Sequence, residues 1–195
     1  MARPPEFDRS RALEAAMKLF WSRGYTATSL SDLLKVMGIA RSSFYASFNT
    51  KRKLFTECLE LFGDRTLAVV DKHASQLSSK DLPRVFFNTT LLDVSQRRAK
   101  QGCMMVNTLL ELAYVDPQLN RLAAAKLSAI ESSFARAFER AQRNGELDST
   151  RSPEQLASLV MTINLGLRVQ SRLNASQKIL KPLIESNLSM LGLAT

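Results

Sequence analysis

Residues 28–48 carry the pattern that most constrains the fold of this chain. Ser29 followed by Asp32 is a capping box, which opens a helix. Apolar residues then recur at helical spacing and predict one buried face: Leu30, Leu33, Leu34 and Met37. Gly38 is expected to end this helix, because glycine takes a left-handed cap at little cost. A second short helix is predicted over about 41–47.

The second helix has a polar outer surface. Phe44 and Phe48 are expected to anchor it in a core. Its outward residues are Arg41, Ser42, Ser43, Tyr45 and Ala46. Two short helices joined by a turn that contains glycine form a helix-turn-helix, and a polar second helix suits the major groove of DNA. An ordinary helical hairpin in an all-α core has the same spacing and remains the alternative.

Further residues fall in one order at fixed intervals around this pattern. They are Gly24-Tyr25-x-x-Thr28-Ser29, Met37-Gly38-Ile39 and Ser43-Phe44-Tyr45-x-x-Phe48-x-x-Lys51-x-x-Leu54-Phe55. Over about residues 8–62 the chain therefore resembles the DNA-binding domain of the TetR family of bacterial repressors. Ala40 departs from the serine that is common at the start of the family's recognition helix. The resemblance implies an all-α protein with an N-terminal three-helix head and a C-terminal helical-bundle body for ligand binding and dimerisation.

Positive charge is concentrated near the N-terminus. The net charge is +9, and residues 1–55 hold ten Lys and Arg against four Asp and Glu, a net +6. This distribution favours a polyanion-binding head on a separate scaffold, although a solvated basic face would give the same composition. We expect a DNA-binding domain over 1–50 and a ligand-binding and dimerisation domain over 51–195, with a linking helix over about 50–75.

The polar residues of the head suit different parts of DNA, and the resemblance assigns them the same roles. Arg41 suits a bidentate contact with guanine, while Ser42 and Ser43 suit base edges or nearby phosphates. Four residues would position the duplex through phosphates without reading its sequence: Tyr45, Lys51, Thr28 and Ser29. The predicted partner is therefore a double-stranded DNA operator.

The linking helix begins at Asn49 or Thr50 with a local conflict. Lys51, Arg52 and Lys53 occupy its first turn, where the helix dipole disfavours cations by ~0.3–1 kcal/mol each. A DNA phosphate at this N-terminus would offset the conflict.

The remainder of the chain is predicted to be helical, with a break over 96–102 and a helix over about 103–114. The last two helices, about 153–172 and 176–192, carry broad apolar bands. In the TetR family such a pair forms a four-helix interface with its twin, so the resemblance implies a homodimer through these segments. A seam inside a monomer core is the alternative. Pro182 should kink the last helix or delay its start.

Enzyme chemistry finds little support in the sequence. The only histidine, His73, has no nucleophile pattern beside it, and no glycine-rich phosphate loop, HExxH motif or carboxylate cluster is present. We expect no catalytic residue, cofactor or metal. The leading function is a sequence-specific DNA-binding regulator, a repressor, that a small ligand or reactive electrophile releases from a palindromic operator. The alternative is a helical ligand-binding or scaffolding protein without specific DNA binding.

The predicted location is the bacterial cytoplasm, in association with the nucleoid. No apolar run reaches the ~20 residues that cross a bilayer, and the first residues lack an apolar signal region. No membrane partner is expected.

Candidate ligand residues come from the predicted helices of the body. An apolar pocket with one or two polar anchors suits a hydrophobic or aromatic small molecule of unknown identity. The candidates are Phe86, Phe87, Cys103, Met104, Asn107, Thr108, Glu111 and Arg168. Plain core packing is the alternative for most of them.

Cys103 is the sharpest of these candidates. It follows Gly102 and is expected in the first turn of its helix, where a helix N-terminus lowers a thiol pKa. The segment from Gly102 to Asn107 resembles the same helix start in a TetR subgroup that includes regulators responding to reactive electrophiles. A buried, inert thiol is the alternative, and it is the role that we assign to Cys58.

Overall fold

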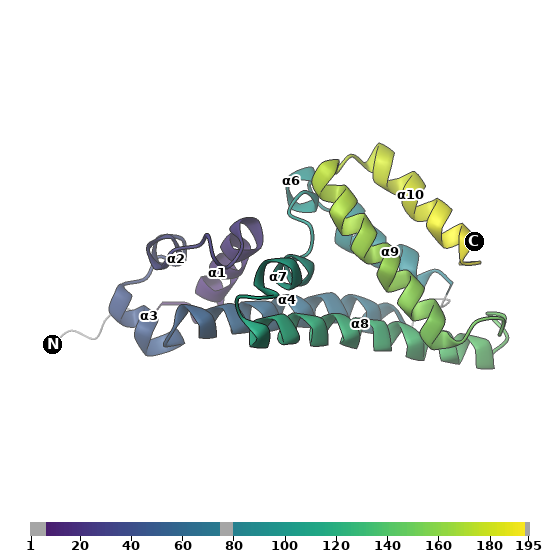
Figure 1. The fold of residues 1–195 in the computed structure, drawn as a ribbon, viewed down its shortest axis with the longest axis horizontal. Coiled ribbons are helices and arrows are strands. Elements are labelled where there is room, and N and C mark those ends of the chain that lie inside the picture. Colours follow the sequence, from purple (N-terminus) through teal and green to yellow (C-terminus); the bar gives the residue numbers. More distant parts are fainter. Residues whose placement is uncertain (1–6, 75–79, 194–195) are drawn as a thin grey trace.

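The computed structural model describes residues 7–74 and 80–193, which form helices and no strand (Figure 1). In chain order the elements are α1 (Arg9–Arg23), α2 (Leu30–Met37), α3 (Arg41–Phe48), α4 (Lys51–Ala74), α5 (Leu82–Phe87), the π-helical turn η1 (Asn88–Leu92), α6 (Gln96–Ala99), α7 (Met104–Leu112), α8 (Pro117–Arg143), α9 (Pro153–Leu173) and α10 (Gln177–Met190). The predicted all-α class is confirmed. None of the described helices is long and apolar enough to span a bilayer.

The head consists of α1, α2 and α3, and local signals in the sequence set its boundaries. Asp8 caps α1 by accepting a hydrogen bond from the Arg11 N–H. Ser29 and Asp32 form the predicted capping box of α2, and Gly38 ends α2 with φ +67°. The core between these helices includes side chains that are almost fully buried: Phe20, Trp21, Leu33, Phe44 and Phe48.

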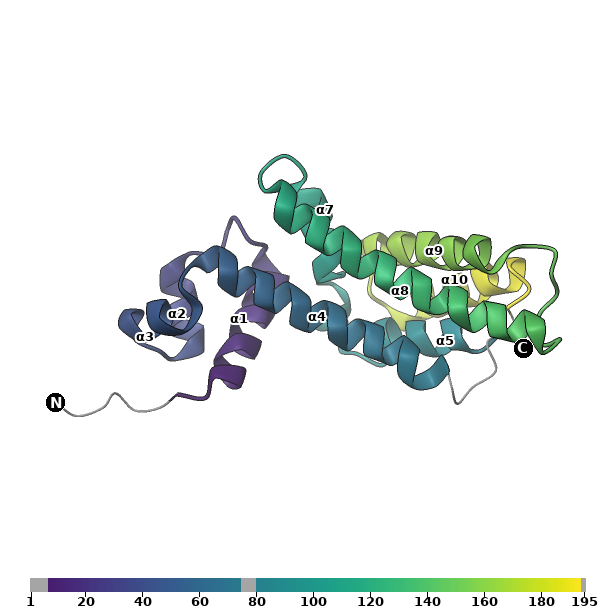
Figure 2. The same cartoon turned by 90° about the horizontal axis from the view of Figure 1, so that it is seen from below.

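The long helices α4 and α8 connect the head to the far end of the body (Figures 1 and 2). They lie side by side in both views and are in contact along their length. The predicted linking helix is therefore present as α4, and its C-terminal half is part of the body rather than a free connector.

Phenylalanine rings from separate elements fill the body core. Phe86 on α5 meets Phe134 on α8 with 5.4 Å between ring centroids. Phe87 and Phe138 are also fully buried. Edge-to-face ring contacts of this kind stabilise a core beyond the area that they bury.

Two local predictions need correction, and a third is narrowed to one of its alternatives. The expected break over 96–102 contains the short helix α6, which Ser95 caps by accepting from the Arg98 N–H. Cys103 is the N-cap of α7 and has an extended backbone, so it lies just before the first turn. Pro182 lies inside α10, which begins at Gln177, so of the two expected effects the delayed start is excluded and the kink stays a prediction.

Candidate nucleic-acid interface and body cavity

Helix α3 presents a short polar surface beside buried anchors. Phe44 and Phe48 are buried, whereas Arg41, Ser42 and Tyr45 are exposed. Ser43 is half-buried. Ala40 is the N-cap and makes no side-chain capping bond, so no N-cap side chain satisfies the first N–H groups of α3, beside Arg41. Such a helix start favours an anion.

Thr28 and Ser29 take different positions beside α3. Ser29 is exposed, and its hydroxyl donates to Asp32 Oδ2 at 2.6 Å. Thr28 is fully buried, and its hydroxyl donates to the Gly24 carbonyl at 2.6 Å. The predicted phosphate contact through the Thr28 side chain is therefore wrong for this conformation, because the hydroxyl holds the turn between α1 and α2.

Lys51 begins α4 and packs on the head. Its ammonium lies 4.4 Å from the centroid of the Tyr25 ring, a cation–π contact. Burial lowers the pKa of Lys51, and the negative charge of Glu111 opposes that change. Lys51 therefore belongs to a head–body contact and also lies at the helix N-terminus where a phosphate was predicted.

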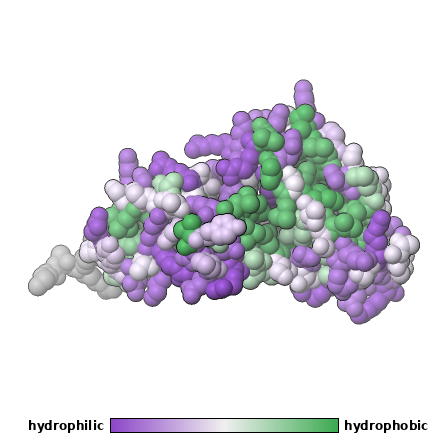
Figure 3. Space-filling view, viewed as in Figure 1, coloured by the Kyte–Doolittle hydropathy of each residue, from purple (hydrophilic) through white to green (hydrophobic). Residues whose placement is uncertain are grey.

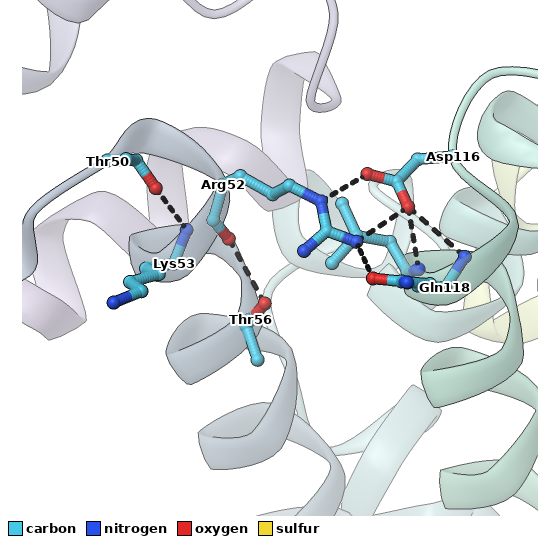
Figure 4. A network of polar contacts seen from close by, with 7 residues as sticks. Thr50, Arg52, Lys53, Thr56, Asp116 and Gln118 are labelled. Carbon is cyan, nitrogen blue, oxygen red and sulfur yellow. Dashed lines mark hydrogen bonds and ion pairs between the residues drawn. The ribbon is translucent and has the colours of Figure 1, made fainter.

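Arg52 is held by the body (Figure 4). Its guanidinium donates to both oxygens of Asp116 at 2.6 and 2.9 Å, and to Gln118 Oε1 at 2.8 Å. Asp116 is also the N-cap of α8 and accepts from the backbone N–H groups of Gln118 and Leu119. The hydrogen bond from Arg52 is the main reason that the pKa of Asp116 falls from 3.8 to about 2. This pair resolves part of the charge conflict in the first turn of α4.

Glu111 on α7 joins the body to the head. Its two carboxylate oxygens accept from the backbone N–H groups of Tyr25 and Thr26, at 3.0 and 2.6 Å. A Cβ atom on Gly24 would lie 2.5 Å from Glu111 Oε2, so glycine at this turn makes the approach possible. Glu111 was predicted to bind ligand, but both of its oxygens are engaged by the head.

Trp21 also connects the head to the body. Its indole N–H donates to the carbonyl of Gly102 at 3.3 Å, immediately before Cys103. The Arg98 guanidinium carbon lies 5.2 Å from the Trp21 ring centroid. The α6–α7 loop of the body thus contacts the first helix of the head directly.

Apart from Glu111, the predicted ligand residues separate into three groups. Cys103 and Arg168 line one cavity of about 250 Å³. Asn107 donates to the Gln101 carbonyl and accepts from Arg172, so it braces the α6–α7 loop. The others are buried within the body core: Phe86, Phe87, Met104 and Thr108. Sequence reasoning could not separate these groups, because the contacts that distinguish them join residues far apart in the chain, such as Arg168 with Thr90 and Asn107 with Arg172.

The two cysteines have different surroundings. Cys103 is buried but lines the cavity. Cys58 is fully buried, its thiol donates to the Leu13 carbonyl, and burial raises its pKa strongly. These features of Cys58 match the structural role that was predicted for it. Within the described residues no group of three His, Cys, Asp or Glu side chains is placed to hold a metal ion.

Comparison with known families accounts for both parts of the chain. Residues 12–58 match the family described as bacterial regulatory proteins, tetR family. Residues 83–186, more than half of the chain, match the tetracyclin repressor-like C-terminal domain. The chain belongs to the TetR family. It is therefore a DNA-binding transcriptional regulator and not an enzyme.

Individual relatives extend this likeness over nearly the whole length. The chain is 29% identical to the HTH-type transcriptional regulator YezE of Bacillus subtilis over 98% of this chain and all of that protein. It is 30% identical to the repressor ComR of Escherichia coli, over 89% of this chain and 84% of that protein. A solved complex of a CifR cysteine mutant with 26-base-pair operator DNA is 28% identical, with a TM-score of 0.82, over 96% of this chain and 98% of that one.

Proposed function

We propose that this TetR-family protein is a repressor that binds a palindromic operator as a homodimer. Helix α3 would lie in the major groove, with Arg41 reading a guanine and Ser42 and Ser43 contacting base edges or nearby phosphates. Tyr45, Ser29 and Lys51 would hold the phosphate backbone. The exposed polar surface of α3 between buried phenylalanines is the observation that carries this proposal.

The proposed dimer uses α9 and α10. Both helices bury one face in the protomer, yet several large apolar side chains stay exposed on the other: Leu159, Leu165, Val169, Leu173, Ile179, Leu183 and Met190. Green hydrophobic surface gathers over this region in Figure 3. An apolar surface of this kind on a two-helix layer is typical of an interface, and symmetric pairing would place two copies of α3 on one operator.

Release would follow from the connections between head and body. A ligand, or a modification at Cys103, that favours another arrangement of the α6–α7 loop would act on Trp21 through Gly102 and on the 25–26 turn through α7. Such a signal binds more tightly to the body conformation that does not bind DNA than to the one that does. The loss of operator affinity equals at most this difference in binding free energy, which is typically about 1–3 kcal/mol. The relative ComR is named as a repressor, which supports this direction of control.

A random-sequence DNA selection tests the proposal. Repeated enrichment on the full-length protein should yield one inverted-repeat sequence with half-sites about one helical turn apart, ~34–36 Å. Enrichment of no common sequence would contradict the proposal. Sedimentation of the protein with the selected duplex should give two protomers per operator, and one protomer per duplex would contradict the dimer.

A further inference from the structure

Arg168 on α9 is a buried cation without a carboxylate partner among the described residues. It is 6% exposed, and the ion pairs found in the described ranges do not include it. Its hydrogen bonds go to neutral acceptors: Asn164 Oδ1 at 3.1 Å, the Thr90 carbonyl at 2.9 Å and Thr90 Oγ1 at 2.6 Å. An arginine remains charged in proteins, and a buried charge is costly unless an opposite charge compensates it.

The cavity that Arg168 lines is positive. Arg65 and Arg98 lie in the same lining, and no Asp or Glu does. Burial lowers the pKa of Arg168, and the positive charge of Arg98 lowers it further. Arg168 is thus electrostatically close to another cation. Arg65 has Glu14 as a partner at 3.6 Å, outside this lining.

The rest of the lining is apolar or carries hydroxyl groups. Trp21, Phe62, Val69 and Met17 supply apolar surface, and Thr66, Thr89 and Thr90 supply hydroxyls. A second hollow of about 540 Å³ shares Met17, Trp21, Arg65 and Arg98 with this cavity and opens beside Arg97. The two hollows are therefore neighbours. Arg98, exposed and stacked near Trp21, lies between them.

We infer that this cavity binds a small organic anion, a carboxylate on an apolar or aromatic body, with the carboxylate on Arg168 and the apolar part against Trp21 and Phe62. A guanidinium has five N–H donors, and Arg168 uses three of them on Asn164 and Thr90, so two remain for charge-assisted hydrogen bonds to a carboxylate. The cavity is smaller than the usual range of pockets for drug-sized ligands, which favours a compact ligand. This inference rests on the proposed function for its regulatory meaning, because it names the class of effector.

The site lies where an occupant would act on the head. Trp21 belongs to α1 and donates to Gly102, and both Trp21 and Cys103 line the cavity. A ligand that moves the Trp21 ring or the start of α7 would therefore change a direct contact between head and body. Arg168 thus links the ligand's charge to the first helix of the DNA-binding head.

The single tryptophan of the chain supplies the measurement. Trp21 fluorescence of the full-length protein is followed during titration with sodium benzoate, benzamide or sodium sulfate at constant ionic strength. Benzoate and benzamide have nearly the same shape and differ in charge. We expect a saturable change in fluorescence with benzoate. The affinity for benzoate should be at least tenfold higher than the affinity for benzamide or sulfate.

Two variants locate the site. Arg168→Gln should abolish the preference for benzoate over benzamide. Because Arg98 is exposed, Arg98→Gln should keep the fold and weaken benzoate binding several-fold. This variant provides a test if Arg168→Gln does not fold.

Three results would each overturn the inference: equal responses to benzoate and benzamide, an unchanged benzoate response in both variants, or no response up to about 10 mM, where binding is very weak. If sulfate binds as tightly as benzoate, the inference that the ligand has an apolar body is contradicted. This titration contains no DNA, so its failure is separate from a failure of the operator selection.

Discussion

The carboxylate of Glu111 accepts the backbone N–H of Thr26 at 2.6 Å and so fastens the turn before α2 to the body. Its other oxygen accepts the N–H of Tyr25 at 3.0 Å. Two backbone donors of the DNA-binding head are therefore satisfied by a side chain 85 and 86 residues away in the chain. Any rotation of α7 has to move this turn or break these bonds.

Glu111→Gln should loosen the turn. A glutamine has only one acceptor oxygen, so one backbone N–H loses its partner at a cost of about 1–2 kcal/mol. Amide exchange of Tyr25 and Thr26, measured by hydrogen–deuterium exchange with NMR, should quicken roughly 5- to 30-fold. Glu60→Gln, an exposed change on α4, is the control. Unchanged exchange in Glu111→Gln would contradict the contact.

Gly24→Ala tests the close approach of Glu111 to the turn. The new Cβ would lie 2.5 Å from Glu111 Oε2, and φ at this position is +85°. We expect a loss of about 1–3 kcal/mol in the free energy of unfolding, measured by urea denaturation. In a Glu111→Ala background the steric part disappears, so the loss should be smaller there. Equal losses in the two backgrounds would show that backbone strain alone is responsible.

The Arg52–Asp116 pair should make stability depend on acid pH. The pKa of Asp116 is about 2 in the folded protein and 3.8 without its partners. The ionised Asp116 therefore stabilises the fold fully above pH ~4, and this contribution is lost as the pH falls toward 2. It amounts to about 1–2 kcal/mol of unfolding free energy after allowance for the partly exposed Arg52. Asp116→Asn keeps an N-cap residue and removes the charge. Urea denaturation should show a gap between wild type and variant that is constant from pH 7 to 5 and narrows below pH 4; a gap independent of pH would contradict the assignment.

Modification of the Cys103 thiol tests whether the signal that releases the operator is covalent or non-covalent. If its thiol is a sensor, treatment with N-ethylmaleimide should lower affinity for the selected operator at least tenfold, about 1.4 kcal/mol, and Cys103→Ser should resist. Cys58 is an internal control, because it is fully buried with a raised pKa. Mass spectrometry locates the modified residue, and fluorescence anisotropy with labelled operator measures the affinity. Loss of binding that persists in the serine variant, or no loss in the parent, means that the thiol is structural.

Local signals predicted the head better than they predicted the site. The Ser29–Asp32 box and Gly38 each depend on residues close in sequence, so the boundaries of α2 could be read directly. The helix-turn-helix and the exposure of Arg41 followed from spacing on α3. Thr28 was misjudged because its burial depends on the fold of the turn from Gly24, which no short pattern reports.

The connections between head and body were out of reach of sequence reasoning for a related reason. Asp116 caps α8 through residues next to it in the chain, but its pairing with Arg52 spans 64 residues. Glu111 had no periodic signal that separated a ligand contact from a contact with the 25–26 turn. The cation conflict at the start of α4 is partly resolved by the pairing of Arg52 with Asp116, and the phosphate contact inferred from it stays a prediction.

The comparison of Arg41→Ala with Lys51→Ala on DNA tests the central claim, that α3 reads bases while the start of α4 holds phosphate. Operator and shuffled duplexes are titrated by fluorescence anisotropy over a series of salt concentrations. Arg41→Ala should lose about 1–3 kcal/mol on the operator and little on shuffled DNA. Lys51→Ala should weaken both duplexes alike and lower the salt slope by about one. Equal losses of specificity in the two variants, or a variant of Arg41 that still discriminates the operator fully, would contradict the account.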